Sequence, residues 1–291
     1  MRDFVLATDS DTEIPYAFAD KHNIPVFLMP YTVNSEEKLF DLGRNTDYVG
    51  FYEGLKKGDD AITSTRPPAD IAEFFGEIVK EGKDVLYLSF SSKLSGHHDL
   101  ALMARDMVLE EYPGSRVEVV DTLKISMGAG LLVIGAQKLK DEGKSLDEVK
   151  EWVLSNRNNA HAWFSVDDLN YLKKGGRLSS TAAALGTILD VKPILIINKE
   201  GKIVPADKIK GTKKVLKYFI GVIEQYAEKP QEQTLYVLHA NDIHNAGKIV
   251  EMVKESFAFK DIVIQDVGPV IGCHAGPGTL AVVFMGKELP Q

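Results

Sequence analysis

The sequence is short of cysteine, of long apolar runs and of positive charge, and each shortage excludes a class of protein. The single Cys273 cannot form an internal disulfide and fits a reducing compartment. The best apolar run, residues 129–136, is far shorter than a membrane span. A net charge of −8 argues against a nucleic-acid partner. Because Met1 leads almost directly into a strand-like run, we expect no signal peptide and a cytoplasmic location.

What is present suits a soluble α/β protein. The 291 residues, 44% hydrophobic and 26% charged, can form two domains. Strand and helix patterns alternate through residues 1–158, which predicts an N-terminal domain with a parallel sheet covered by helices on both faces. A hairpin signal at residues 199–201 is mixed with further crossovers, so residues 159–291 are predicted to form an α+β domain with a mixed sheet.

Polar loops follow several of the expected strands. They are residues 8–12 (TDSDT), 63–65 (TST) and 89–98 (SFSSKLSGHH). Ligands bind outside the carboxyl ends of strands in open parallel sheets, and hydroxyl and N–H groups at helix starts bind anions. The same residue types also cap helices. We favour capping for residues 9–12, whose carboxylates would repel an anion, and ligand binding for residues 63–65 and 91–95.

One histidine lies in a glycine-rich stretch near the C-terminus. Residues 270–279 read VIGCHAGPGT, which predicts a turn before the last strand. Three glycines around His274 allow a close approach of the backbone and leave the imidazole as the principal polar side chain. A lone histidine is more often a structural hydrogen-bonding group, but the surrounding glycines favour a functional role.

Other chemistries find little support. The first strand-to-helix turn has no glycine, so the dinucleotide-binding fingerprint is missing. The spacing of His239, Asp242 and His244 does not suit a metal site, and we expect neither metal nor cofactor. A serine hydrolase using Ser95 and His274 stays open as the alternative, although the Gly-x-Ser-x-Gly pattern is absent. His97 and His98 follow Ser95 too closely to act easily as its base.

Seven stretches together resemble the DegV family of bacterial fatty-acid-binding proteins, which includes the FakB-type partners of fatty acid kinase. They span nearly the whole chain and read ATDSDTEIP, ITSTRPPAD, SFSSKLSGHHDLA, VVDTLKISMGAG, DDLNYLKKGGRLSS, LDVKPIL and IGCHAGPGTLAVVF. The resemblance implies a two-domain, non-catalytic protein that holds one long-chain fatty acid in a buried tunnel and presents its carboxylate to a kinase for acyl-phosphate formation.

The resemblance also implies roles for particular residues. The carboxylate-binding positions of the family correspond to Thr63, Ser95, Gly96 and His274, with Ser64 assisting. His274 would act either as a cation or as a neutral donor. Lys210 stands where FakB-type members usually have an arginine linked with kinase contact, while Arg177 is expected to make a structural contact between domains. Transient contact with a membrane surface stays open.

Overall fold

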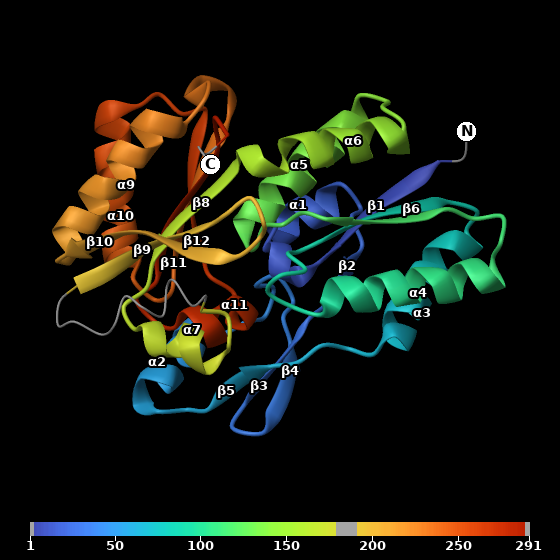
Figure 1. Cartoon of the computed structure of the whole chain (residues 1–291), viewed down its shortest axis with the longest axis horizontal. Coiled ribbons are helices and arrows are strands. Elements are labelled where there is room, and N and C mark those ends of the chain that lie inside the picture. Colours follow the sequence, from blue (N-terminus) through green and yellow to red (C-terminus); the bar gives the residue numbers. More distant parts are fainter. Residues whose placement is uncertain (1–2, 179–190, 289–291) are drawn as a thin grey trace.

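The computed structural model describes residues 3–178 and 191–288, so parts of the stretches DDLNYLKKGGRLSS and LDVKPIL lie outside the described residues. Its N-terminal part is built on a parallel sheet of four strands in the order β2-β1-β6-β7 (Figure 1). All three strand pairings are parallel, which confirms the predicted sheet type. The strands are β1 (Phe4–Asp9), β2 (Val26–Phe27), β6 (Asp84–Ser89) and β7 (Val117–Asp121).

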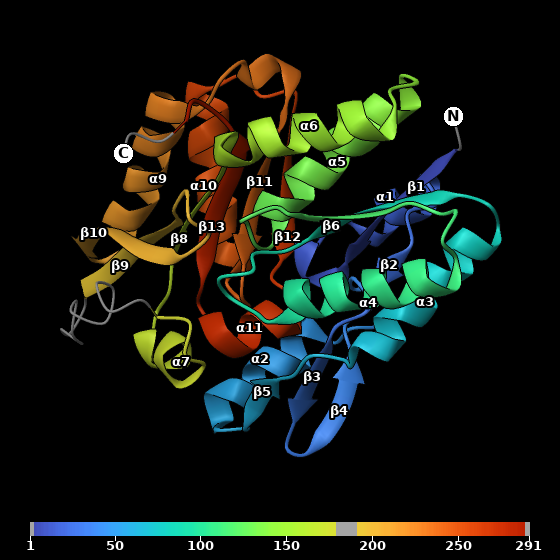
Figure 2. The same cartoon turned by 45° about the vertical axis from the view of Figure 1, so that its right-hand side comes forward.

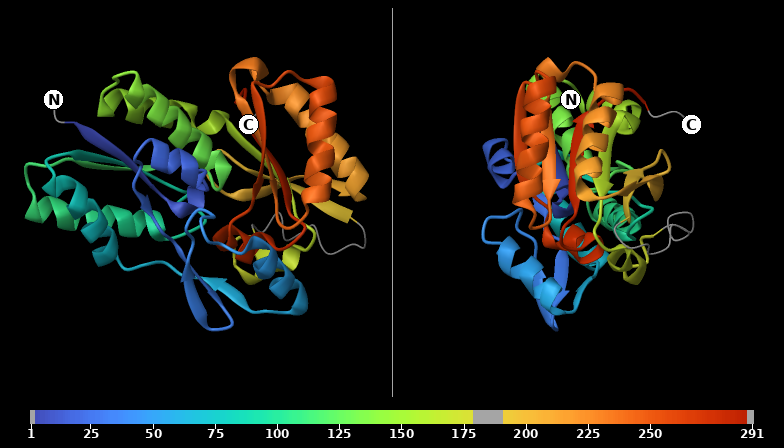
Figure 3. Two further views of the ribbon diagram at one scale, coloured as in Figure 1. Left: turned by 180° about the vertical axis from the view of Figure 1, so that it is seen from behind. Right: turned by 90° about the vertical axis from the view of Figure 1, so that its left-hand side faces the viewer.

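Helices cover this parallel sheet on both faces, as the alternating pattern predicts. Figures 1 and 3 show α3 and α4 on one face, and α5 and α6 on the other. In α3, Pro68 begins the helix and the apolar side chains Ile71, Phe75 and Val79 are buried against the sheet. The helices are α1 (Tyr16–Lys21), α3 (Pro68–Lys80), α4 (His97–Glu111), α5 (Met127–Asp141) and α6 (Leu146–Asn156).

The C-terminal part is built on a mixed sheet of six strands in the order β10-β9-β8-β13-β11-β12. Only β11 and β12 pair in parallel, and β9 and β10 form the predicted hairpin. Helices α9 (Thr212–Tyr226) and α10 (Ile243–Ser256) lie side by side over the sheet (Figure 3). The strands are β8 (Ala160–Ser165), β9 (Val191–Ile197), β10 (Ile203–Lys210), β11 (Thr234–His239), β12 (Asp261–Asp266) and β13 (Leu280–Met285).

The mixed α/β fold class is therefore confirmed, with one parallel sheet and one mixed sheet. The proposed division between residues 158 and 159 falls within a short 3-10 turn, Arg157–Asn159, that joins α6 to β8. Among the described residues, no helix combines the length and the apolar character that a membrane span requires.

Two parts of the fold differ from the sequence-based expectation. The sequence predicts one extended segment over residues 24–33. Instead, β2 belongs to the parallel sheet and β3 (Pro30–Val33) to a separate antiparallel sheet. In that small sheet, β3 pairs with β4 (Glu36–Leu39) and β5 (Ala61–Thr63). The sequence predicts a helix over residues 48–57, and α2 (Tyr48–Lys57) has these bounds and connects β4 to β5.

The second difference concerns the glycine-rich stretch around His274, which begins as a helix before the predicted turn follows at residues 277–278. Helix α11 (Pro269–Ala275) starts at a proline and packs against β5 and α7 (Leu169–Lys174), as Figure 2 shows. Gly272 lies within this helix, where an added Cβ would stand 2.6 Å from Tyr52 Oη. Gly272 therefore permits close packing between α11 and α2.

Candidate functional site

The structure contains a cavity of about 310 Å³, lined by residues from both halves of the chain. This volume lies at the lower end of the range of small-molecule sites, roughly 300–1,000 Å³. Most of the lining is apolar and includes Phe90, Leu94, Phe164, Leu238, Ile271 and Val283. The polar lining includes every head-group residue that the sequence predicts: Thr63, Ser64, Ser95, Gly96 and His274.

Thr63 and His274 come from distant parts of the sequence and meet in the cavity wall. Thr63 is the last residue of β5, and His274 lies in the last turn of α11. Thr63 Oγ1 is 2.8 Å from His274 Nε2, which is hydrogen-bonding distance. The packing of α11 against β5 creates this pair, and 211 residues separate its two members.

The imidazole of His274 is held from its other side by the end of α7. Nδ1 is buried and has no hydrogen-bond partner among the described residues. A Cβ on Gly175 would overlap this nitrogen, so Gly175 permits the close approach of the α7 terminus. Burial, together with the positive charge of Arg177, lowers the pKa of His274 to about 4. Burial therefore favours the neutral ring, one of the two states considered from the sequence.

Ser95 and Gly96 precede α4 at the outer end of the cavity. The Ser95 hydroxyl accepts a hydrogen bond from the backbone N–H of His97, at 3.1 Å, and keeps its own proton for donation. Ser95 is half-buried, whereas Gly96 and Ser64 are exposed. These residues thus form a polar mouth through which the cavity meets solvent.

Arg177 also lines the cavity, a position that the sequence analysis did not assign to it. Its Nε donates to the carbonyl of Leu94 at 2.9 Å, and its Nη1 donates to the carbonyl of Gly175. The contact with Leu94 links the two halves of the chain, in agreement with the structural role expected. The same geometry places a guanidinium group in the lining, which only the tertiary structure reveals.

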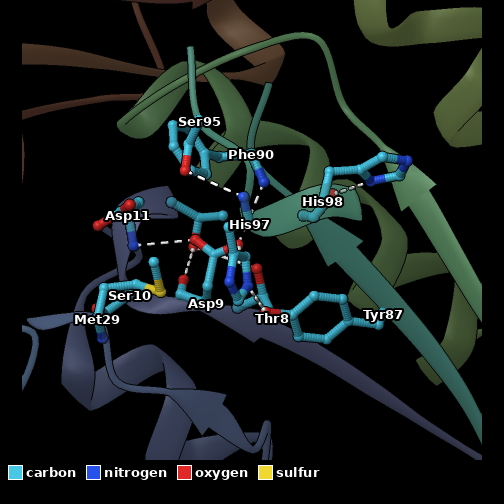
Figure 4. A network of polar contacts seen from close by, with 12 residues as sticks. Thr8, Asp9, Ser10, Asp11, Met29, Tyr87, Phe90, Ser95, His97 and His98 are labelled. Carbon is cyan, nitrogen blue, oxygen red and sulfur yellow. Dashed lines mark hydrogen bonds and ion pairs between the residues drawn. The ribbon is translucent and has the colours of Figure 1, made fainter. Parts of the chain in front are cut away.

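The remaining polar residues of the loops have structural partners. Ser91 is buried and donates to the carbonyl of Gly201 at 2.8 Å, so the predicted ligand role is wrong for this serine. Asp9 accepts from the backbone N–H of Asp11 and caps the 3-10 turn Ser10–Thr12, which confirms the capping expected there. His97 Nε2 lies 2.7 Å from Tyr87 Oη (Figure 4).

The described geometry gives little support to hydrolysis or to a metal site. Among the described residues, no hydrogen bond joins Ser95 to His274, and none joins His274 to a carboxylate. His98 Nδ1 pairs with Ser89 Oγ at 2.7 Å and so is directed at a different serine. No group of three or more histidine, cysteine or acidic side chains within residues 3–178 and 191–288 is arranged to hold a metal ion.

The two sheets and the cavity define an α/β protein whose internal site suits an amphiphilic small molecule, with apolar walls and a polar mouth. The chain belongs to the DegV family, because the family model described as "Uncharacterised protein, DegV family" matches residues 3–287. A DegV domain-containing protein of Clostridium perfringens is 39% identical over 286 residues, covering 98% of each chain. One from Streptococcus pyogenes serotype M1 is 36% identical, covering 98% of this chain and 99% of that protein.

Solved structures give the same result for the fold. A DegV family protein from Thermus thermophilus, described as binding fatty acid, matches with a TM-score of 0.86 and 29% identity. DegV of Bacillus subtilis, described as a fatty acid binding protein, matches with a TM-score of 0.84 and 26% identity. Each match covers 99% of this chain and 100% of the other. The family resemblance inferred from the sequence motifs is confirmed.

Proposed function

We propose that this protein binds one long-chain fatty acid, with the carboxylate at the polar mouth and the hydrocarbon chain in the apolar cavity. The proposed head-group residues are Thr63, Ser64, Ser95, Gly96 and His274. One observation carries this proposal: a cavity with apolar walls ends at hydroxyl, imidazole and backbone donors. The descriptions of the Thermus thermophilus and Bacillus subtilis proteins as binding fatty acids support it.

The mouth offers what a half-buried carboxylate requires. With its proton on Nε2, the neutral His274 ring donates to Thr63 Oγ1, which leaves the threonine hydroxyl proton free for the carboxylate. Ser95 and the backbone N–H of Gly96 provide two further donors. Arg177 adds a positive charge in the lining, which offsets part of the cost of removing the carboxylate from water.

The hydrocarbon chain supplies most of the binding free energy. Burying about fifteen methylenes at roughly 0.8 kcal/mol each gives about 12 kcal/mol before costs are subtracted. Lost translational freedom and the ordering of the chain consume several kcal/mol of this gain. The remainder supports stable retention provided that the carboxylate keeps its hydrogen bonds.

We further propose that the protein is the non-catalytic lipid-binding partner of a fatty acid kinase. Because Ser64 and Gly96 are exposed, a carboxylate bound beside them is accessible to a second protein. Lys210 is exposed at the end of β10, an edge strand, and exposed Lys213, Lys214 and Lys217 follow it. These side chains offer a basic surface for the kinase. A cytoplasmic location is part of this proposal, since acyl-phosphate formation consumes ATP.

Mass spectrometry of an organic extract of the native, purified protein tests the lipid proposal. We expect one long-chain fatty acid per chain. A protein that carries no acid and takes none up from an added mixture would refute the proposal. A fluorophosphonate probe tests the hydrolase alternative, because it labels only a reactive serine. We expect no covalent labelling of Ser95, since His274 pairs with Thr63 instead.

A further inference from the structure

Polar side chains line the cavity at two depths. Ser64 is exposed at the mouth, whereas Asp11, Ser126 and Thr279 are buried in the wall. The protein itself satisfies two of the three buried groups. The Ser126 hydroxyl donates to Glu13, and the Thr279 hydroxyl donates to backbone carbonyls at the end of α11, at 2.9 Å. Asp11 is the exception.

The Asp11 side chain is fixed in the wall without a partner for one of its oxygens. The residue is 2% exposed, and Oδ1 has no hydrogen bond within the described part of the chain. Its backbone is fully engaged: the N–H donates to Asp9 Oδ1, and the carbonyl accepts from the N–H of Ser126, each at 3.0 Å. In Figure 4 only the backbone amide of Asp11 is directed at Asp9. An unpaired buried oxygen is costly.

The surroundings of the Asp11 carboxyl favour its protonated form, which has a proton to donate. Asp9, Asp11 and Glu13 are all buried within five residues of sequence. Burial, reinforced by the charges of Asp9 and Glu13, raises the pKa of Asp11 well above its ordinary value. Asp9 and Glu13 accept hydrogen bonds from the backbone N–H groups of Phe90 and Gly268. Asp11 is the member of this group that faces the cavity.

We propose that Asp11 is a specificity-determining residue for fatty acids whose chain carries an oxygen function, a hydroxyl or oxo group, that accepts a hydrogen bond from the Asp11 carboxyl. This inference rests on the proposed function, because a carboxylate at the exposed mouth leaves the hydrocarbon chain to pass the buried wall. A saturated chain there offers the Asp11 carboxyl no hydrogen-bond partner. A buried polar group of this kind discriminates against the analogue that lacks its partner.

The experiment compares dissociation constants of the purified, delipidated protein for octadecanoic acid and for positional isomers of hydroxyoctadecanoic and oxo-octadecanoic acid. We expect the wild type to bind at least one oxygenated isomer roughly tenfold more tightly than octadecanoic acid. Asp11→Leu removes the donor and presents an apolar surface, so it weakens binding of that isomer and strengthens binding of octadecanoic acid. Asp11→Asn keeps an N–H donor and retains the preference.

Ser165→Ala is the matched control, because the Ser165 hydroxyl is also buried and without a hydrogen bond among the described residues but does not line the cavity. It is expected to retain the wild-type preference, and thermal unfolding verifies that each variant is folded. The proposal is overturned if no oxygenated isomer is preferred, or if Asp11→Leu weakens the binding of all acids equally. A wild type that binds neither octadecanoic acid nor its oxygenated forms refutes the proposed function itself, and this inference with it.

Discussion

At the scale of single residues, the site depends on hydroxyl groups that still have a proton to donate after making their hydrogen bonds within the protein. Ser95 accepts a backbone hydrogen bond and still has its O–H, and Thr63 is in the same position if His274 donates to it. Ser91, in the same loop as Ser95, instead donates its hydroxyl proton to the carbonyl of Gly201. Hydroxyl content alone therefore does not identify the binding serine, because each serine's partner depends on the surrounding fold.

Removing single donors tests this arrangement. We expect Ser95→Ala and His274→Ala each to weaken fatty-acid retention by roughly tenfold or more. Ser95→Ala removes a hydrogen bond to a charged group, which contributes about 1.5–3 kcal/mol. His274→Ala leaves Thr63 without the partner that orients its hydroxyl toward the carboxylate. Retention is measured as the bound fraction after dialysis, with circular dichroism to establish that the fold is intact. Ser92→Ala is the matched control, because this serine is in the same loop but outside the cavity lining. Unchanged retention in both test variants would remove Ser95 and His274 from the head-group site.

A second residue-scale prediction concerns pH and stability. Burial raises the pKa of Glu13 from 4.5 to about 7. As pH rises from about 4.5 to 7, the unfolded chain releases a proton that the folded protein retains, so the free energy of unfolding falls. Glu13→Gln abolishes this titration, and its stability should fall less over this window, by up to about 3 kcal/mol. Urea unfolding at pH 5 and pH 8 measures the difference; identical losses in the two proteins would contradict the raised pKa.

At the scale of elements, helix ends place the functional groups. The C-terminal turn of α11 carries His274, the end of α7 packs against its ring, and the start of α4 carries Ser95 and Gly96. The close approach of α7 to the imidazole requires a residue without a side chain at position 175. The Gly-Gly pair that ends α7 thus has a role in shaping the site as well as in stopping the helix.

Gly175→Ala tests this packing. Gly175 has ordinary helical backbone angles, so the expected effect arises from overlap of the new methyl group with His274. Overpacking of this kind typically costs about 1–3 kcal/mol, and displacement of the ring should weaken fatty-acid retention. Gly221→Ala in α9 is the control, because nothing lies within 4 Å of its added Cβ. Equal retention in the two variants would show that α7 does not position the imidazole.

At the scale of the whole molecule, the cavity exists only because the two halves of the chain pack against each other. Phe90 and Leu94 come from the N-terminal part, whereas Phe164 and Val283 come from strands of the mixed sheet. Ser64 and Gly96 at the mouth are exposed, and so are Lys210, Lys213, Lys214 and Lys217. The proposed kinase contact at Lys210 uses residues that do not line the cavity.

A charge reversal separates these two features. Lys210→Glu should lower the rate of acyl-phosphate formation by a fatty acid kinase supplied with ATP, while fatty-acid retention stays as in the wild type. Lys254→Glu makes the same charge change at an exposed position of α10 and should leave the rate unaffected. If both variants support the same rate as the wild type, Lys210 is not part of a kinase contact.

The sequence by itself determined most of the elements and the family. The sequence predicts helices over residues 48–57 and 146–156, and α2 and α6 have these ends, because packing of an apolar helical face agrees with local preference there. The small sheet of β3, β4 and β5 was missed, since its short strands pair through contacts distant in sequence. The turn at residues 277–278 was predicted, but the short helix α11 before it was not, because Gly272 within it serves close packing rather than chain reversal.

The tertiary structure alone decided which polar residues share one cavity. Local sequence motifs marked Thr63, Ser95 and His274, but only long-range packing brought them to a common mouth and added Arg177 to the lining. Long-range packing also places the Ser91 hydroxyl where it donates to the backbone carbonyl of Gly201. The physical reason is that a side chain's partners, burial and protonation depend on the groups that folding places around it, and these come from all parts of the chain.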